Sequence, residues 1–246
     1  MGFFTALKFL TIVPLPGRLG KTTDDLGKSL TYFPLVGLVL GAILFGLHYG
    51  LSFILPPPVV SVLLIIALVL MTGAHHLDGL MDSFDGVVIG KSRERRLEIM
   101  ADSRVGAFGI IAAILVLLLK YASLVSLSDA MMMPALLLMP ALGRWIMVSA
   151  IFIFPYARSS GMGLAFKQSA AWHRFAIATA IAIVASVLLL SWGALVLMAV
   201  LWLITFGIVR YFHSRLGGLT GDVYGALNEL SEAVVLILII IIAWRL

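Results

Sequence analysis

Long apolar runs alternate with short polar connections along the whole chain. A transmembrane helix needs about 20 predominantly apolar residues, and about seven runs approach that length. They cover residues 33–55, 59–76, 107–127, 131–154, 175–191, 193–211 and about 231–246, of which the last is the shortest. The pattern predicts an all-α, polytopic integral membrane helical bundle of about seven transmembrane helices. No internal repeat interrupts it, so residues 1–246 are expected to form a single membrane-embedded domain.

The amino-acid composition agrees with this prediction and excludes several kinds of chemistry. Hydrophobic residues make up 62% of the 246 positions and charged residues 12%, whereas a soluble domain is about half apolar and about a quarter charged. The chain has no cysteine, which excludes disulfides, thiolate catalysis and cysteine-ligated zinc. Residues 1–15 do not match a cleavable signal peptide, and we expect an amphipathic helix at the membrane interface with Phe3, Phe4, Leu7 and Leu10 toward lipid.

The basic residues predict how the chain is oriented. Fourteen of the 17 Lys and Arg residues fall before the first run or in alternate connections between runs. By the positive-inside rule, these connections and the N-terminus are expected to face the cytoplasm. The net charge of +5 therefore indicates orientation and not nucleic-acid binding. The fourteen are Lys8, Arg18, Lys21, Lys28, Lys91, Arg93, Arg95, Arg96, Arg104, Arg158, Lys167, Arg174, Arg210 and Arg215.

Three aspartates gather in the stretch HHLDGLMDSFDG, residues 75–86. Asp78, Asp82 and Asp85 have the spacing i, i+4, i+7, which places them on one face of a helix. Like charges at this spacing repel one another, and carboxylates beside lipid are costly, so a divalent cation would offset both effects. Hard carboxylate oxygens favour Mg²⁺, with Mn²⁺ as an alternative ion. The competing interpretation is that the aspartates only solvate the end of the second transmembrane helix.

A second acidic stripe follows in residues 91–109. Glu94, Glu98 and Asp102 are four residues apart and are interleaved with arginines, including Arg104. A salt-bridged surface helix would explain Glu94 and its neighbours. Glu98 and Asp102 lie close to the next apolar run, so the two acidic stripes could face one another across a metal site while arginines hold phosphate oxygens.

Ionisable residues also occur inside or beside the apolar runs. Lys120 interrupts the third run, where snorkelling to the interface and a functional role are both open. Arg144 lies about ten residues inside the fourth run, too deep to snorkel easily, which favours an inward role binding an anion or an aspartate. His76 is either a hydrogen-bonded core histidine or a participant in the chemistry.

Two further polar segments complete the set of candidate residues. The segment GMGLAFK, residues 161–167, combines glycines with Lys167 and could cradle phosphate. In residues 216–232, interpreted as the last cytoplasmic piece, Thr220 or Asp222 could cap the helix that follows. Asp222, Glu229 and Glu232 share one helical face, which capping alone would not explain.

The stretches GAHHLDGLMDSFDGV, LEIMADSRVGAFG and LGGLTGDVYGALNELSE, together with ALKFLTIVPLP and YFPLVGLVLGA, resemble the cobalamin synthase family. The resemblance covers nearly the whole chain, with five motifs in order. It implies an adenosylcobinamide-GDP ribazoletransferase of the inner membrane that uses Mg²⁺. Such an enzyme joins adenosylcobinamide-GDP to α-ribazole, or to its 5′-phosphate, and releases GMP.

Carried onto this sequence, the resemblance places the family's acidic motif on Asp78, Asp82 and Asp85, with Glu98 and Asp102 in a second acidic element. The hypothesis is that Asp78, Asp82, Asp85 and Asp102 bind one or two Mg²⁺ ions on the pyrophosphate. Glu98 or His76 would accept the proton of the ribazole hydroxyl. The candidates for substrate and phosphate contacts are Arg104, Arg144, Lys167, Thr220 and Asp222. Contact with membrane lipid is expected, and self-association and docking of soluble pathway enzymes are left open.

Two rival functions remain open. The segment Asp82-Ser-Phe-Asp85-Gly is also similar to the paired-aspartate core of CDP-alcohol phosphotransferases, although Ile89-Gly90 replaces the Ala-Arg expected there. The more distant rival is a cation-coupled transporter, in which ionisable residues lie near the bilayer midplane and the two halves often repeat. Here the acidic residues gather at one end and no repeat is found, so transfer is favoured over transport.

Overall fold

The structure is a computed structural model and describes residues 2–15, 20 and 22–245. Within these ranges the chain forms twelve helices and no extended strand. Six helices are long and apolar enough to cross a membrane, and a seventh crossing results if the bent pair α4 (Pro57–Met71) and α5 (His75–Ile89) is one span. The expectation of an all-α polytopic bundle is confirmed. Arg18 and Lys21, which entered the orientation argument, lie outside the described residues.

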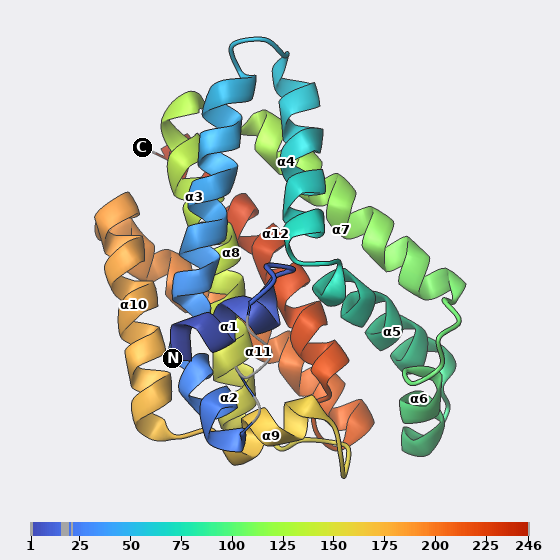
Figure 1. The fold of residues 1–246 in the computed structure, drawn as a ribbon. Helices are drawn as coiled ribbons and strands as arrows, with labels where there is room; N and C mark the ends of the chain where they lie inside the picture. The colour runs from blue at the N-terminus through green and yellow to red at the C-terminus, as the bar shows by residue number, and fades with distance from the viewer. Residues whose placement is uncertain (1, 16–19, 21, 246) are drawn as a thin grey trace.

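The other ten helices vary from one to several turns in length. They are α1 (Gly2–Leu10), α2 (Thr23–Leu30), α3 (Phe33–Leu51), α6 (Arg93–Ile99), α7 (Ala107–Ser126), α8 (Asp129–Ile153), α9 (Met162–Gln168), α10 (Trp172–Leu190), α11 (Gly193–Leu216) and α12 (Gly221–Arg245). In Figure 1, α8 and α12 occupy the middle of the bundle, with α10 on one side and α5, α6 and α7 on the other. The short helices α1, α2 and α9 lie together at one end.

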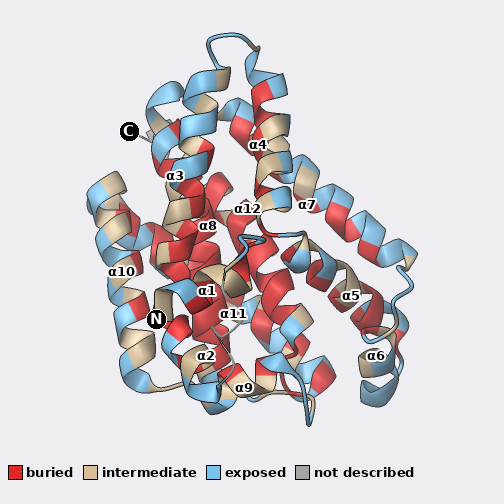
Figure 2. Ribbon diagram, in the orientation of Figure 1, coloured by how far each residue is buried: buried red, intermediate tan, exposed pale blue. Residues whose placement is uncertain are grey.

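Helix α8 is the central element of the core. Its apolar stretch is 83% buried, and Figure 2 shows the buried residues concentrated on α8 and α12. Gly37 and Gly41 of α3 lie directly against the α8 backbone around Leu136 and Ala141, where an added Cβ would collide with main-chain atoms. Small residues of this kind let transmembrane helices approach closely.

A sharp bend separates α4 from α5. The two helices meet at 88° across a short break, where Gly73 and Ala74 have left-handed φ angles of 61° and 57°. The predicted second run extended to residue 76, but its helix ends at Met71. The acidic stretch of residues 75–86 therefore lies on a separate helix at a sharp angle to α4 and does not continue the axis of α4.

Helix α12 begins about ten residues earlier than the sequence pattern predicted. Residues 216–232 were expected to form a cytoplasmic connection, but one continuous helix runs from Gly221 to Arg245. Glu229 and Glu232 are buried inside the bundle. The cap expected at Thr220 or Asp222 is confirmed at Thr220, whereas the cytoplasmic position expected for Glu229 and Glu232 is wrong, because Lys120 of another helix pairs with both.

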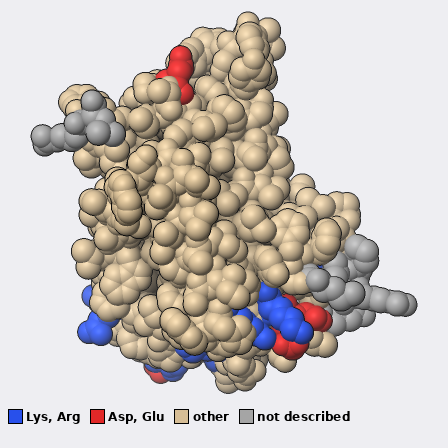
Figure 3. Space-filling view, turned by 90° about the vertical axis from the view of Figure 1, so that its left-hand side faces the viewer, with Lys and Arg blue, Asp and Glu red and all other residues tan. Residues whose placement is uncertain are grey.

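The N-terminal helix lies against the bundle. Leu10 is buried against the core, contrary to the expected lipid-facing role, whereas Phe4 is 52% exposed. Figure 3 shows Lys and Arg gathered at the lower end of the visible face and the sides of the bundle almost free of them. The separation of charge from the apolar flank is what a membrane protein requires.

Candidate active site

A cavity of about 570 Å³ lies where α1, α5, α8, α9 and the start of α12 meet, and small-molecule sites usually have volumes of about 300–1,000 Å³. Its ionisable and hydroxyl-bearing side chains include members of the acidic segments 75–86 and 216–232 singled out from the sequence. They are Thr5, Lys8, His75, His76, Asp78, Asp222 and Tyr224. The cavity thus brings together residues that are separated by more than 140 positions in the chain.

Close packing of α5 on α12 brings the acidic groups together. An added Cβ at Gly79 would lie 2.6 Å from the carbonyl oxygen of Asp222, and one at Gly225 would lie 3.1 Å from the Cα of His76. Glycine at both positions lets the two backbones approach. The neighbour of Gly79 at this contact is the α12 backbone.

The acidic group consists of Asp78 and Asp222, which line the cavity, and Asp82, which is partly buried one turn further along α5. The negative charges of Asp78 and Asp222 both act unfavourably on the Asp82 carboxylate. The Nη2 atom of Arg158 lies 3.0 Å from a carboxylate oxygen of Asp222. One arginine therefore offsets part of the negative charge of three carboxylates.

Among the described residues, no three acidic or histidine side chains converge closely enough to enclose a metal ion. A cage built from protein ligands alone, with three aspartates of α5, is therefore not formed. Mg²⁺ is usually held by one or two carboxylates plus water and substrate phosphates, and rarely by an all-protein cage. The carboxylates at the cavity fit that shared mode of binding.

Asp85 has partners of its own at the start of α7. Its two carboxylate oxygens accept hydrogen bonds from the backbone N–H groups of Gly106, at 2.7 Å, and Gly109, at 2.9 Å. The side chain is buried. A carboxylate at a helix N-terminus satisfies unpaired N–H groups and complements the helix dipole. The sequence analysis placed Asp85 in the metal site, whereas the structure uses both of its oxygens to join α5 to α7.

Replacing Asp85 with asparagine tests this role. The amide would present an NH₂ group to one of the two backbone N–H donors, leaving a buried donor without an acceptor at a cost of about 1–3 kcal/mol. We expect Asp85→Asn to lower the unfolding temperature of the purified protein while the Mg²⁺ concentration for half-maximal activity stays the same. A higher Mg²⁺ requirement with unchanged thermal stability would return Asp85 to the metal site.

The second acidic stripe lies outside the cavity. Glu98 is exposed and paired with Arg95 at 3.0 Å, and Asp102 binds Arg104 through two nitrogens. This pairing lowers the pKa of Asp102 to about 2. Arg104 is likewise exposed. Neither Glu98 nor Asp102 lines the cavity that contains Asp78.

Arg144 and Lys120 belong to a buried ionic network. The Nζ atom of Lys120 donates to Glu229 at 2.7 Å and to Glu232 at 2.6 Å. Arg144 donates to Glu232 at 2.8 Å, and Asn228 donates to the same oxygen at 2.8 Å. Snorkelling is thus the wrong account of Lys120. The inward role expected for Arg144 is confirmed, with a glutamate as its anion.

The remaining two candidates have local partners. Lys167 donates to the carbonyl oxygen of Phe152 at 2.8 Å, near the end of α8, and burial lowers the pKa of its amine. The Thr220 hydroxyl accepts from the Val223 N–H and donates to Asp222 at 3.2 Å, so it caps α12 and orients the carboxylate. Lys167 does not line the cavity.

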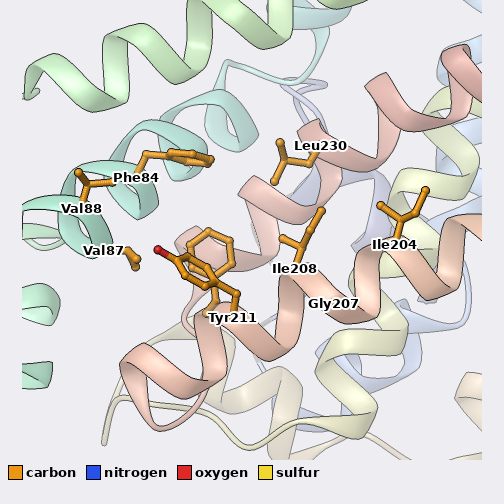
Figure 4. Close-up of a pocket in the computed structure, with 9 residues that line it drawn as sticks. Phe84, Val87, Val88, Ile204, Gly207, Ile208, Tyr211 and Leu230 are labelled. Carbon is orange, nitrogen blue, oxygen red and sulfur yellow. The ribbon is translucent and has the colours of Figure 1, made fainter.

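A second cavity, of about 480 Å³, lies between α5, α11 and α12. Figure 4 shows Phe84, Val87, Ile208 and Leu230 around it, with the Tyr211 hydroxyl as the polar atom among the labelled side chains. No carboxylate, imidazole or cation lines it among the described residues. It lacks the groups that acid–base or phosphate chemistry requires.

Sequence reasoning missed two residues at the first cavity. Arg158 entered only as a basic residue of a polar connection, and its proximity to Asp222 depends on folding. Tyr224 lies two residues after Asp222, in the segment whose carboxylates were expected to share a helical face. The signal that could have found it is its place between Gly221 and Gly225 on that predicted helix.

Comparisons with known proteins agree on one family. A family model described as cobalamin-5-phosphate synthase matches residues 2–240. Two similar proteins are named adenosylcobinamide-GDP ribazoletransferase: one from Desulforamulus reducens is 42% identical over 96% of this chain and 94% of its own, and one from Geotalea daltonii is 40% identical over 99% and 98%. A protein of the same name from Roseiflexus sp. is 42% identical over 94% of this chain and 86% of its own. No solved structure matches the chain.

Proposed function

The chain belongs to the cobalamin-5-phosphate synthase family, and we propose that it carries out the ribazoletransferase reaction at the cavity between α5 and the start of α12. The observation that carries this placement is the meeting of Asp78 and Asp222, from distant parts of the chain, at one cavity. Adenosylcobinamide-GDP is the activated substrate named in the relatives. The acceptor is α-ribazole or its 5′-phosphate.

The reaction exchanges one P–O bond for another. A hydroxyl oxygen of ribazole forms a bond to the phosphorus that carries the cobinamide group, and the bond from that phosphorus to the GMP oxygen breaks. GMP leaves with the electron pair, and the hydroxyl loses its proton. Catalysis of such transfers depends mainly on positioning and on stabilising phosphate charge.

The residues at the cavity have separate roles in this proposal. Asp78 and Asp222, which line the cavity, would hold Mg²⁺, with Asp82 beside them one turn further along α5. An ion held there would supply positive charge to offset the charge of the leaving phosphate. Arg158 holds Asp222 in place at 3.0 Å. Of the two proton acceptors considered from the sequence, His76 lines the cavity and Glu98 does not, so His76 is the favoured base.

Basic residues at the cavity end of the bundle indicate how the protein is oriented in the membrane. Lys8 and α9 border the cavity, and the basic residues visible in Figure 3 gather at that end. By the positive-inside rule, we place this end at the cytoplasmic face of the inner membrane. Soluble substrates would then reach the cavity from the cytoplasm.

Metal removal tests the Mg²⁺ assignment. Purified protein treated with EDTA and dialysed is expected to release no measurable GMP, and Mg²⁺ should restore release because two or three uncompensated carboxylates otherwise repel the pyrophosphate. The measurement is GMP formation against Mg²⁺ concentration. Full activity in metal-free buffer would contradict the assignment.

The assay that tests the function offers competing substrates to one preparation. Adenosylcobinamide-GDP with α-ribazole is compared with a CDP-activated alcohol, and liposomes containing the protein are checked for cation-coupled uptake. The proposal expects a corrinoid product and GMP only in the first reaction. Release of CMP alone would favour a phospholipid synthase, and uptake without a product would favour a transporter.

A further inference from the structure

Three phenylalanines form an aromatic wall in the cavity, on helices other than those that carry the acidic groups. Phe9 of α1, Phe33 of α3 and Phe166 of α9 all line it. Their ring centroids lie 4.7 Å apart for Phe9 and Phe166, 5.7 Å for Phe33 and Phe166, and 5.9 Å for Phe9 and Phe33. Positioning a pyrophosphate does not require such a wall.

The other wall presents polar atoms without partners. His76 and Tyr224 are 7% and 3% exposed. Within the described part of the chain, the Nδ1 atom of His76 and the hydroxyl of Tyr224 have no hydrogen-bond partner. Buried polar side chains are nearly always hydrogen-bonded. Two unpartnered groups beside one cavity therefore point to a ligand with polar atoms at that wall.

The cavity volume limits which substrate can enter. At 570 Å³ it falls within the usual range of about 300–1,000 Å³ for small-molecule sites. α-Ribazole is an aromatic dimethylbenzimidazole attached to a hydroxyl-rich ribose, so it has one apolar end and one polar end. The corrinoid of adenosylcobinamide-GDP is several times larger and is not divided into one apolar end and one polar end.

We propose that the cavity is the binding site of the nucleoside acceptor, with its benzimidazole against Phe9, Phe33 and Phe166. The ribose points toward His76 and Tyr224, which brings its hydroxyls beside Asp78 and Asp222. The corrinoid stays outside, and only its pyrophosphate reaches the carboxylates. This inference rests on the proposed transferase function and adds which substrate occupies the cavity and which residues select its base.

Variants of the aromatic wall test the proposal by separating the two substrates. Phe9→Leu and Phe166→Leu each remove one aromatic face, which is worth up to about tenfold in affinity. We expect the KM for α-ribazole to rise by about that factor, with the KM for adenosylcobinamide-GDP unchanged. Phe175→Leu is the matched control, because Phe175 stacks on Phe152 at 4.9 Å and does not line the cavity. An equal rise in both KM values, or none for ribazole, would overturn the proposal.

Two measurements on the unchanged protein do not depend on a variant folding correctly. Free 5,6-dimethylbenzimidazole should inhibit competitively against α-ribazole and not against adenosylcobinamide-GDP; the reverse pattern would place the base elsewhere. Equilibrium dialysis of α-ribazole alone should show binding that dimethylbenzimidazole displaces. If ribazole binds in this way but no GMP is released, the transferase function fails while the binding site stands. If GMP is released but dimethylbenzimidazole competes with the corrinoid, the proposed acceptor site is wrong while the transferase function stands.

Discussion

Asp78→Asn and Asp82→Asn are each expected to slow GMP release by about 100-fold or more, the usual loss when a group that organises transition-state charge is removed. Asparagine keeps the size of the side chain but removes its charge. Asp78 lines the cavity, and its charge and that of Asp82 interact. The measurement is kcat for GMP release from adenosylcobinamide-GDP and α-ribazole at saturating Mg²⁺, with Mg²⁺ titrated separately for each variant.

The matched control is Glu94→Gln, the same kind of change on an exposed side chain. Glu94 makes one long contact, 3.8 Å, to Arg93, and it does not line the cavity. Its activity should equal that of the unchanged protein. Removing one carboxylate should relieve repulsion on the other, so the aspartate variants should be at least as stable to heat. Activity of both aspartate variants within threefold of the unchanged protein, a margin of less than about 1 kcal/mol, would remove α5 from the reaction.

Hydrophobic runs were sufficient to predict six helices long enough to span a membrane, because each needs about 20 apolar residues, but they did not predict the break between α4 and α5. They were insufficient for α12, whose first half carries Asp222, Glu229 and Glu232. A segment with several charged residues is interpreted as a polar connection when the residues that pair with those charges are not known. Here Lys120 of α7 pairs with both glutamates, and this pairing across distant segments is invisible in the local pattern.

Helical spacing predicted which carboxylates share a face but not what lies opposite that face. Asp78 and Asp85 are both on α5, yet one lines the cavity and the other caps α7. The 88° bend before α5 sets the direction of this helix relative to α4, and the sequence pattern did not predict it. One residue of that bend is Ala74 at a φ of 57°, and alanine carries no turn signal in a sequence. The site could therefore be predicted as a set of residue types and segments, but not as a geometry.

Glu232→Gln is expected to produce the largest loss of stability. Among the described residues, Glu232 is the one carboxylate bound to both Lys120 and Arg144, at 2.6 Å and 2.8 Å. Its neutral replacement leaves two buried cations with only Glu229, and removing one partner from a buried ion pair costs about 3–5 kcal/mol. The measurement is thermal or denaturant unfolding of the purified protein in detergent micelles.

A double variant separates charge balance from the mere loss of contacts. Lys120→Met combined with Glu229→Gln removes one cation and one anion, so Arg144 and Glu232 remain as a neutral pair. We expect this double variant to be more stable than Glu232→Gln, although it changes two buried residues instead of one. The opposite order would mean that packing and not charge balance governs this region. The network joins α12 to α7 and α8, and the first turn of α12 carries Asp222 at the cavity. Charge balance in the network would therefore also keep Asp222 facing α5.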